Sequence, residues 1–533
     1  MARTLAMFTD TSLCIGCRAC QVACKQWNEL GLEVPEWTGT YQNHTHFTDK
    51  TFRLVPLHRG AASPPGDLAW LLMSDVCKHC AQAGCLDACP TGAIYRTEYG
   101  TVNINQDVCN GCRYCVSSCP FGVVSFNETT GTAKKCTFCN DRIHNGLGPA
   151  CAKACPTDSI QFGFRDELVT KAQKARRDPE GDGLQGRAAL WGRLQGASSG
   201  GLNAFFLLLS KPSTYDLPDK PKLPQRNVVV DSLLSDRLGH RHRAGRAAGL
   251  PRSAGREAAM LKTPDWEMMI VWYFFLGGIA GGAYFTAAIA DNFGTARDRA
   301  VARTGYLLSL PLVGMCGLLL VADLGVPLRF LNMLGAFKFW DPMSLGAWMV
   351  GVFGVFTFVS SVLSFTSSEK MVALRRKIGL VGVLFGFFLA SYTGVLLSNS
   401  AMPFWSDARL MGALFLASGA STGMAAVSLL MFVTGASAGE GWGKVKKADR
   451  FSMIFELLVL ATFLVMLGSA AKPITTGHFA PLFWGGLVAM GLVIPLVLDL
   501  VGHRIRAVAP IAAVLVLVGG FILRYVVLMS IQA

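Results

Sequence analysis

Hydrophobic residues are unevenly distributed along this chain of 533 residues. The part before Trp266 is polar and basic, whereas the part after it consists of long apolar blocks separated by short basic loops. Eight blocks can be read, and each is about as long as a helix that crosses a bilayer. They cover residues 268–290, 305–325, 346–365, 378–397, 411–433, 452–470, 481–501 and 509–529. The pattern predicts a soluble module joined to an integral membrane module.

The chain is expected to have three segments: a folded module over residues 1–225, a basic linker over 226–264 and a membrane bundle over 265–533. The stretch 164–262 is basic and rich in Gly, Ser and Ala, which is typical of a solvated connector. Within it, the apolar run 202–209 is too short to span a membrane and is expected to pack on the first module. The opening residues show neither a signal-peptide core nor a twin-arginine signal.

Cysteine is concentrated in the first module, where sixteen of the seventeen cysteines precede Phe162. They form four runs, and three of these end in Cys-Pro. The runs are Cys14, Cys17, Cys20 and Cys24; Cys77, Cys80, Cys85 and Cys89; Cys109, Cys112, Cys115 and Cys119; and Cys136, Cys139, Cys151 and Cys155. Repeated two-residue spacing is typical of [4Fe–4S] clusters, in which the last cysteine of a run binds the other cluster of a pair. Sixteen thiolates suit four clusters, and the module is expected to be α+β and ferredoxin-like.

Disulfides and structural zinc are the alternatives for these cysteines. Disulfide frameworks rarely repeat a two-residue spacing, and zinc motifs usually come as two short pairs per ion. The remaining Cys316 is expected to be a small buried thiol between helices. Lys78, His79 and His144 lie near the cysteines and are interpreted as surface groups, or as hydrogen-bond donors that tune the clusters, rather than as ligands. The Gly-rich segment 277–282 fits close packing between helices.

Several segments of the first module resemble a known family. They are CIGCRACQVACKQWNEL (14–30), residues 75–94, residues 109–122 and residues 136–163, in which GPACAKACP (148–156) is especially similar. They are similar to the iron–sulfur subunit of molybdopterin oxidoreductases, most of all to the formate dehydrogenase beta subunit. The resemblance implies a nested exchange of ligands, whereas the spacing alone supports only an even exchange of fourth ligands. The implied sets are Cys14, Cys17, Cys20 and Cys155; Cys24, Cys136, Cys139 and Cys151; Cys77, Cys80, Cys85 and Cys119; and Cys89, Cys109, Cys112 and Cys115.

The membrane half resembles a second family, that of polysulfide reductase-type membrane subunits. The matching segments include YFFLGGIAGGA (273–283), ADLGVPLRF (322–330), PMSLGAW (342–348) and YTGVLL (392–397). The resemblance implies an anchor for an iron–sulfur subunit that exchanges electrons with menaquinone or ubiquinone, here fused into one polypeptide. One position departs from the family, because Val326 stands where Arg is common and leaves Arg329 as the nearer cation.

Polar residues near one end of the apolar blocks are candidates for the quinone site. Tyr273 and Tyr392 are suited to hydrogen-bond a quinone carbonyl, Asp323 and Glu267 to relay protons, and Arg329 to supply a cation. The alternative is that these residues are interfacial anchors and a structural ion pair. All nine histidines lie outside the apolar blocks, so we expect no haem.

The formal charge of +14 is interpreted as a signal for membrane topology. We do not expect the protein to bind nucleic acid. Loops after the odd-numbered blocks hold thirteen Lys and Arg residues, against Arg329, Lys338, Arg409 and Lys472 on the other side. The positive-inside rule then places the cysteine module on the extracytoplasmic face of a prokaryotic inner membrane, although the basic tract 237–262 favours the opposite.

These features favour a non-catalytic electron-transfer subunit that connects a molybdenum or tungsten pterin enzyme to quinone in the lipid bilayer. Formate is the first expectation for the partner's substrate, and polysulfide, thiosulfate or a sulfoxide follows. Two other possibilities are a quinone-linked redox module without a pterin subunit and a membrane half that is only a passive anchor.

Overall fold

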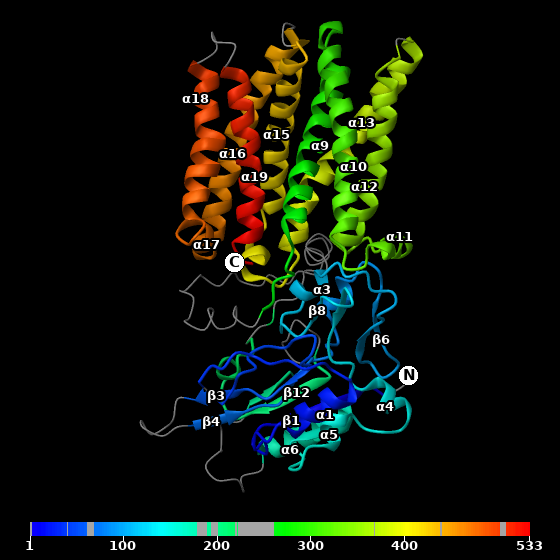
Figure 1. Ribbon diagram of the computed structural model, residues 1–533, viewed down its shortest axis with the longest axis vertical. Coiled ribbons are helices and arrows are strands. Elements are labelled where there is room, and N and C mark those ends of the chain that lie inside the picture. The colour runs from blue at the N-terminus through cyan, green and yellow to red at the C-terminus, as the bar shows by residue number, and fades with distance from the viewer. Residues whose placement is uncertain are drawn as a thin grey trace, which may run out of the picture. The chain divides into compact units, whose positions relative to one another are not determined.

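The computed structural model describes residues 3–532, except residues 40, 61–68, 178–188, 193–200, 219–220, 222–260, 367, 437–439 and 502–507. The chain divides into two compact units, Met1–Pro264 and Asp265–Ala533 (Figure 1). Most of the expected linker 226–264 lies outside the described residues, so its boundaries stay a prediction.

A four-stranded sheet organises the first unit, with the strand order β10-β1-β12-β11. The strands are β1 (Leu5–Asp10), β10 (Ile160–Phe164), β11 (Ala189–Trp191) and β12 (Ala204–Leu208). Strand β1 is antiparallel to β10 and parallel to β12. The prediction that the apolar run 202–209 packs on this module is therefore confirmed.

Helix α6 (Arg165–Arg177) corrects the interpretation of the region after Phe164 as a solvated connector. Its Leu168 and Ala172 are buried against Ala6 and Phe8 of β1. These two helix residues are four apart and form a narrow apolar stripe, which the many charges around them conceal in the sequence.

Pairs of short strands and short helices make up the rest of this unit. The pairs are β2 (Arg53–Leu54) with β5 (Asp75–Val76), β3 (Leu57–Gly60) with β4 (Ala69–Leu72), β6 (Ile94–Arg96) with β7 (Val102–Ile104), and β8 (Ser125–Asn127) with β9 (Thr132–Lys134). The helices are α1 (Ala19–Trp27), α2 (Gly84–Asp87), α3 (Tyr114–Ser117), α4 (Asn140–His144), α5 (Ala150–Lys153) and the 3-10 turn η1 (Pro212–Tyr215).

Eight helices of the second unit are long and apolar enough to cross a membrane, counted over the described residues. They are α9 (Met268–Phe293), α10 (Arg299–Ala322), α12 (Pro342–Leu363), α13 (Glu369–Ser398), α15 (Met411–Val433), α16 (Glu440–Leu467), the π-helical η6 (Leu482–Val493) continued by α18 (Ile494–Val501), and α19 (Val508–Met529). Short helices lie between some of them, namely α11 (Leu331–Gly335), α14 (Pro403–Asp407) and α17 (Lys472–Thr475), with 3-10 turns η2 (Ala296–Asp298), η3 (Pro327–Arg329) and η5 (Gly468–Ala471). The predicted fold class, an α+β module followed by an all-α bundle of about eight spans, is confirmed.

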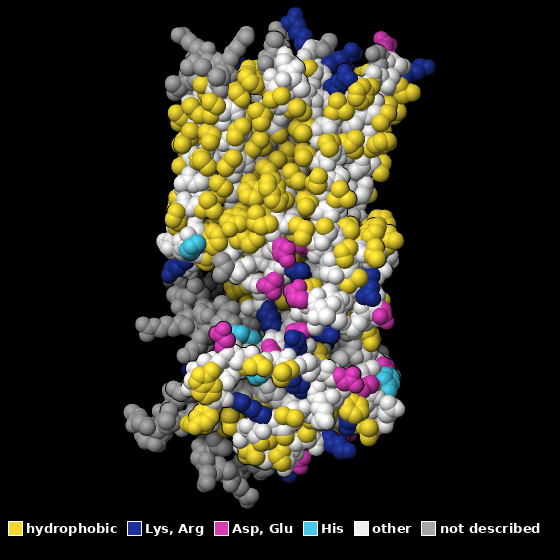
Figure 2. All heavy atoms as spheres, viewed as in Figure 1, with side chains coloured by type: hydrophobic (Ala, Val, Ile, Leu, Met, Phe, Trp, Pro, Cys, Tyr) yellow, Lys and Arg dark blue, Asp and Glu magenta, His cyan; other side chains and the backbone are white. Residues whose placement is uncertain are grey.

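The outer surface of the helical unit is apolar. Leu318, Val355, Leu384 and Val465 are each more than 60% exposed, although they lie in the middle or second half of long helices. Figure 2 shows hydrophobic side chains covering the sides of this unit, with Lys and Arg gathered at the end drawn uppermost. An apolar belt of this kind is unfavourable in water and matches the interior of a bilayer, so the second unit is a multi-pass membrane domain.

Glycine allows the central helices to touch through their backbones. A Cβ atom on Gly281 of α9 would stand 2.6 Å from the carbonyl oxygen of Gly386 in α13. The neighbouring Gly282 faces the backbone of α15 at Gly419 and Gly423 in the same way. The sequence interpretation of segment 277–282 as a packing motif is confirmed. Cys316 is also buried as predicted, with its Sγ 3.8 Å from the Cβ position of Gly277.

Candidate functional site

Two cysteine loops of the first unit share an unusual backbone. Gly16 and Gly111 have φ angles of 70° and 74°, and Arg18 and Arg113, two residues later, have φ angles of 61° and 62°. Arginine in the left-handed region costs about 1–2 kcal/mol, whereas glycine is free to adopt it. Each loop runs directly into a short helix, α1 with Cys20 and Cys24 or α3 with Cys115. The two runs therefore share one backbone shape around their first three cysteines.

For the first two sets of cysteines, the thiols that influence the pKa of one another show which of them are neighbours. Burial raises the pKa of the Cys14 thiol, and the nearby thiols of Cys20, Cys155 and Cys17 raise it further. Burial likewise raises the pKa of Cys24 to about 12, with Cys151 and Cys139 among the neighbours that add to the rise. Cys24 therefore has thiols of the fourth run beside it as well as Cys20 of its own run.

The other two sets follow in the same way. Burial raises the pKa of Cys80, and Cys77, Cys119 and Cys85 are its charged neighbours. Burial also raises the pKa of Cys115, whose neighbours include Cys112, Cys109 and Cys89. Two small cavities support the grouping independently. One is lined by Cys14, Cys17, Cys20 and Cys155, and the other by Cys77, Cys80, Cys85 and Cys119.

The donor chemistry fits iron–sulfur clusters. So many buried thiols with raised pKa values favour the protonated form, and only a strongly positive metal centre offsets the cost of holding them as thiolates. Within the described residues, no three Cys, His, Asp or Glu side chains converge closely enough to hold a single metal ion. The four thiolates of a cubane bind four different iron atoms and so stand farther apart than the ligands of one zinc ion.

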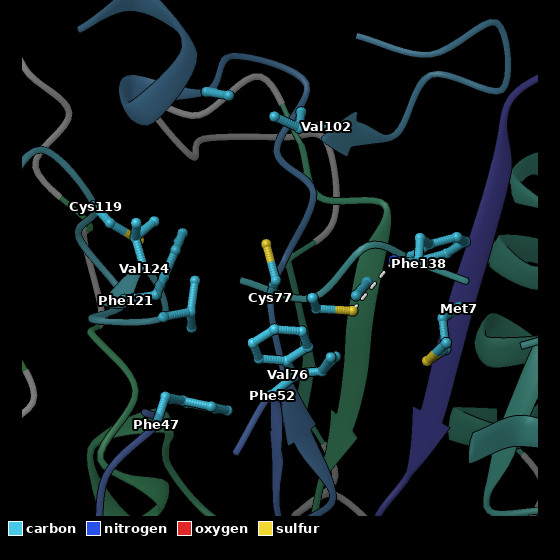
Figure 3. Close-up of a cluster of buried hydrophobic side chains, with 14 of the residues drawn as sticks. Met7, Phe47, Phe52, Val76, Cys77, Val102, Cys119, Phe121, Val124 and Phe138 are labelled. Atoms are coloured by element: carbon cyan, nitrogen blue, oxygen red, sulfur yellow. Dashed lines mark hydrogen bonds between the residues drawn. The ribbon is translucent and has the colours of Figure 1, made fainter. Parts of the chain in front are cut away.

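Many of the cysteines are part of the hydrophobic core of the unit. Cys77, Cys119 and Cys136 belong to one buried cluster with Val76, Phe121 and Phe138, among others. Figure 3 shows Cys77 and Cys119 among these apolar side chains, and the dashed line marks the Phe138 amide donating to the Cys136 sulfur at 3.3 Å. Such surroundings exclude water from the thiols and lower the local dielectric constant.

Of the two interpretations of Lys78 and His79, the surface one is wrong, because both are only 1% exposed, whereas a role in tuning the clusters stays a prediction. Lys78 pairs with Asp75 and also donates to the Val76 carbonyl. The Nδ1 atom of His79 accepts a hydrogen bond from the Val102 amide at 3.1 Å. Only His144 is at the surface, where it contacts Glu98. Lys78 and His79 are buried because Asp75 pairs with Lys78 and because the chain folds around the cysteines. The local sequence reveals neither.

The membrane unit brings the predicted tyrosines to a similar depth. Helix α9 packs against α13 with Gly281 beside Gly386 and Gly277 beside Leu389. One further turn toward the amino end of α9 reaches Tyr273, and one further turn toward the carboxyl end of α13 reaches Tyr392. Both tyrosines are buried, at 1% and 4% exposure.

Each tyrosine has a distinct environment. The Tyr273 hydroxyl is buried and has no hydrogen-bond partner within the described part of the protein. An orphaned hydroxyl of this kind fits a group supplied by a substrate. The ring of Tyr392 stacks on Phe388 with 5.6 Å between centroids and fills the space beside Gly346. A side chain at Gly346 would collide with that ring.

The other predicted residues lie nearer the ends of the helices. Asp323 is 7% exposed at the carboxyl end of α10, Glu267 is exposed just before α9, and Arg329 is partly exposed in η3. Glu267 and Arg329 are therefore at the surface of the bundle, whereas Asp323 is buried at a helix end and the two tyrosines are buried within their helices. The arrangement suits transfer of protons from the exposed Glu267 carboxylate toward the buried hydroxyls of Tyr273 and Tyr392. The structure does not bring all five side chains into contact.

Sequence reasoning missed a polar network inside the bundle. Glu456 of α16 accepts a hydrogen bond from Ser421 Oγ of α15 at 2.5 Å. Ser418 lies one turn earlier on α15, and its Oγ accepts from Arg524 of α19 at 2.5 Å. Glu456 and Arg524 were each visible as ionisable residues in apolar blocks, but only the packing of α15 between α16 and α19 connects them.

Comparison with known proteins matches the family model "Polysulphide reductase, NrfD" to residues 257–533, which is more than half of the sequence. The chain belongs to the NrfD polysulphide reductase family. Ahead of this NrfD domain, residues 68–165 match the model of a 4Fe-4S dicluster domain. The protein is thus an NrfD-family member that carries its own iron–sulfur domain, and the predicted fusion of the two is confirmed.

Relatives of the iron–sulfur part come from several reductase and dehydrogenase complexes. The formate dehydrogenase, nitrate-inducible, iron-sulfur subunit of Escherichia coli (strain K12) is 40% identical over 171 residues, 32% of this chain and 58% of that protein. A subunit of the anaerobic dimethyl sulfoxide reductase of the same organism is 34% identical, covering 32% of this chain and 78% of that protein. A thiosulfate reductase electron transfer subunit of Salmonella typhi is 41% identical, covering 30% and 76%. The NrfD-family protein therefore joins a 4Fe-4S dicluster domain to a membrane domain, and it spans 58% of the length of the first of these relatives.

Proposed function

We propose that this chain is a membrane-bound wire with four [4Fe–4S] clusters that connects a pterin-containing oxidoreductase to quinone. The grouping of sixteen thiols into four sets carries the proposal. Cross-set neighbours also give the sets an order: Cys20 and Cys151 connect the first set to the second, Cys136 and Cys77 the second to the third, and Cys85 and Cys115 the third to the fourth. A linear order is what stepwise transfer between one-electron centres needs, and a bound cubane supplies one-electron chemistry without binding substrate.

The first set is the proposed contact with the catalytic subunit. Cys17 is the most accessible of its ligands, since it is exposed while Cys20 is buried. Ile15 and Val22 beside it are 62% and 64% exposed, and Trp27 is 43% exposed. An exposed apolar patch around an accessible ligand is suited to a permanent protein interface. We propose that a molybdenum or tungsten pterin subunit covers this patch.

The membrane domain is proposed to oxidise or reduce quinone beside Tyr273 and Tyr392. The orphaned Tyr273 hydroxyl would donate to a quinone carbonyl, and Tyr392 would form the wall opposite Gly346. Asp323 and Glu267 are proposed to exchange protons with the aqueous side, and Arg329 to attract the anionic form of the substrate. Menaquinone and ubiquinone both fit this chemistry. No haem is invoked, because the apolar blocks contain no histidine.

Formate is the proposed substrate class of the partner, since the first relative named above is a formate dehydrogenase subunit. Reduction of a sulfoxide or of thiosulfate is the second candidate, favoured by the other two relatives. We also propose that the iron–sulfur unit faces away from the cytoplasm. The Lys and Arg residues in loops after the odd-numbered spans support this orientation.

The test is anaerobic purification of the tagged full chain from its native membranes. We expect about sixteen iron atoms per polypeptide, from four cubanes, together with a co-purifying large subunit that contains molybdenum or tungsten. Iron for only one or two cubanes would contradict the four-cluster wire. Full iron without a large subunit would instead favour the stand-alone quinone module. In the same preparation, Tyr273→Phe is expected to raise the KM for quinol about 3–10-fold, the worth of one lost hydrogen bond. An unchanged KM would remove Tyr273 from the site.

A further inference from the structure

Arg53 is a buried cation of the iron–sulfur unit that the proposed function does not yet explain. Its side chain is 1% exposed, in the short strand β2 that pairs with β5. One guanidinium nitrogen donates to Ser74 Oγ at 2.7 Å, and the other contacts Met7 Sδ at 2.7 Å. The Nε atom has no hydrogen-bond partner within the described part of the protein. None of these partners carries a negative charge.

A buried arginine without a carboxylate is strongly unfavourable unless another negative group compensates it. The negative groups near Arg53 are the thiolates. Ser74 connects it to the first set, because Ser74 Oγ lies 3.1 Å from Cys20 Sγ. The charges that act on the guanidinium come from Cys20 of the first set and from Cys24, Cys136 and Cys151 of the second. Arg53 is thus beside two sets at once.

Lys78 provides the contrast within the same unit. It is as deeply buried as Arg53, but the carboxylate of Asp75 pairs with it directly. The charge of Lys78 is therefore balanced by protein, whereas that of Arg53 is left for whatever the thiols hold.

We propose that Arg53 is the shared counter-ion of the clusters held by the first and second sets, and that it raises the reduction potentials of both. The inference rests on the proposed four-cluster function. Reduction adds one electron to a cluster and forms or breaks no bond, so the extra negative charge is what the guanidinium stabilises. Its attraction for both centres also offsets the repulsion between the two added electrons, so that both can be reduced together.

The experiment is a redox titration of the anaerobically purified full chain, followed by electron paramagnetic resonance, for wild type and variants. In Arg53→Met we expect two of the four one-electron steps to move at least tenfold toward the oxidised form, which is 59 mV for a one-electron couple, while two stay in place. Arg53→Lys keeps the charge and is expected to move both steps by less than half of that. Lys25→Met is the matched control: it removes one positive charge beside Cys24, at a side chain whose ammonium is solvent-exposed, and is expected to move no step appreciably.

Ser74→Asp gives the same test without removing the guanidinium, because the new carboxylate neutralises Arg53 in place. Two steps are again expected to move toward the oxidised form. Unchanged potentials in whichever of R53M and S74D retains full iron would overturn the inference, as would an equal shift in K25M. A wild-type protein with fewer than four clusters would instead contradict the proposed function, and iron analysis before the titration separates the two failures.

Discussion

The backbone contact between α9 and α13 offers a sharp test of the membrane fold. In Gly281→Ala, the new Cβ would stand 2.6 Å from the Gly386 oxygen, about 0.8 Å inside an ordinary contact of 3.4 Å. Both atoms belong to helix backbones, so the two helices must move apart. Overpacking of this kind costs about 1–3 kcal/mol, and the better helix propensity of Ala returns about 0.5–1 kcal/mol. Because neither backbone can yield, the upper half of that cost applies, about 2–3 kcal/mol, and the net loss is then about 1–2.5 kcal/mol.

The assay is thermal unfolding of the purified protein in one detergent, followed by tryptophan fluorescence. A loss of this size is expected to lower the Tm by about 2–8 °C. The matched control is Gly351→Ala on α12, where a Cβ would meet nothing within 4 Å. G351A is expected to leave the Tm unchanged or slightly raised. Equal Tm values for G281A and G351A would refute the close approach of the two helices. The quinol KM should rise in G281A alone, since the same helix pair carries Tyr273 and Tyr392.

Three further outcomes are expected. Asp291 of α9 accepts two hydrogen bonds from Arg375 of α13 at 2.6 and 2.7 Å. D291N leaves the buried guanidinium without its partner and should lower the free energy of unfolding by about 3–5 kcal/mol. A D291L/R375M variant that is no more stable than D291N would contradict this. The hydrogen bond from Lys444 lowers the pKa of Asp298. The contribution of this pair to the free energy of unfolding is therefore complete above the unfolded pKa of about 3.9 and is lost as the pH falls. The Tm difference between wild type and D298N should shrink below about pH 4, and a constant difference would refute the pairing. Removing iron with a chelator under oxidising conditions should make the first unit sensitive to protease while the helical unit stays resistant, and equal sensitivity would contradict their separate stabilisation.

Much of the membrane fold could be predicted because hydropathy and span length are local properties. The block 411–433 coincides with α15, and the block 509–529 is one residue shorter than α19. The ends of other helices were missed where charged turns extend them. Helix α13 begins at Glu369, nine residues before its apolar block, and α16 begins at Glu440, twelve residues before its block. Helices continue beyond a bilayer through polar residues, which a search for apolar runs does not detect.

The cysteine module was predictable in composition but not in its contacts. Two-residue spacing indicates a cage, yet the proposed exchange of Cys24 and Cys155 between runs depends on how α1 packs on α5, about 130 residues later. Arg53 illustrates the limit more clearly, since nothing around it in the sequence separates a buried counter-ion from an ordinary surface arginine. Its position follows from a two-residue strand whose partner, β5, is about 20 residues away. Such non-local pairing leaves little trace in the local pattern of residues.

The place of β1 in its sheet has a consequence for biosynthesis. This strand is made first, but both of its neighbours, β10 and β12, are made about 150 to 200 residues later. The sheet cannot close until Leu208 has been translated, and Met268 of the first span follows only about 60 residues afterwards. At ribosomal speeds of about 5–20 residues per second, that interval is about 3–12 s. Iron delivery that outlasts this interval would have to reach the module after the ribosome has begun to insert the membrane domain.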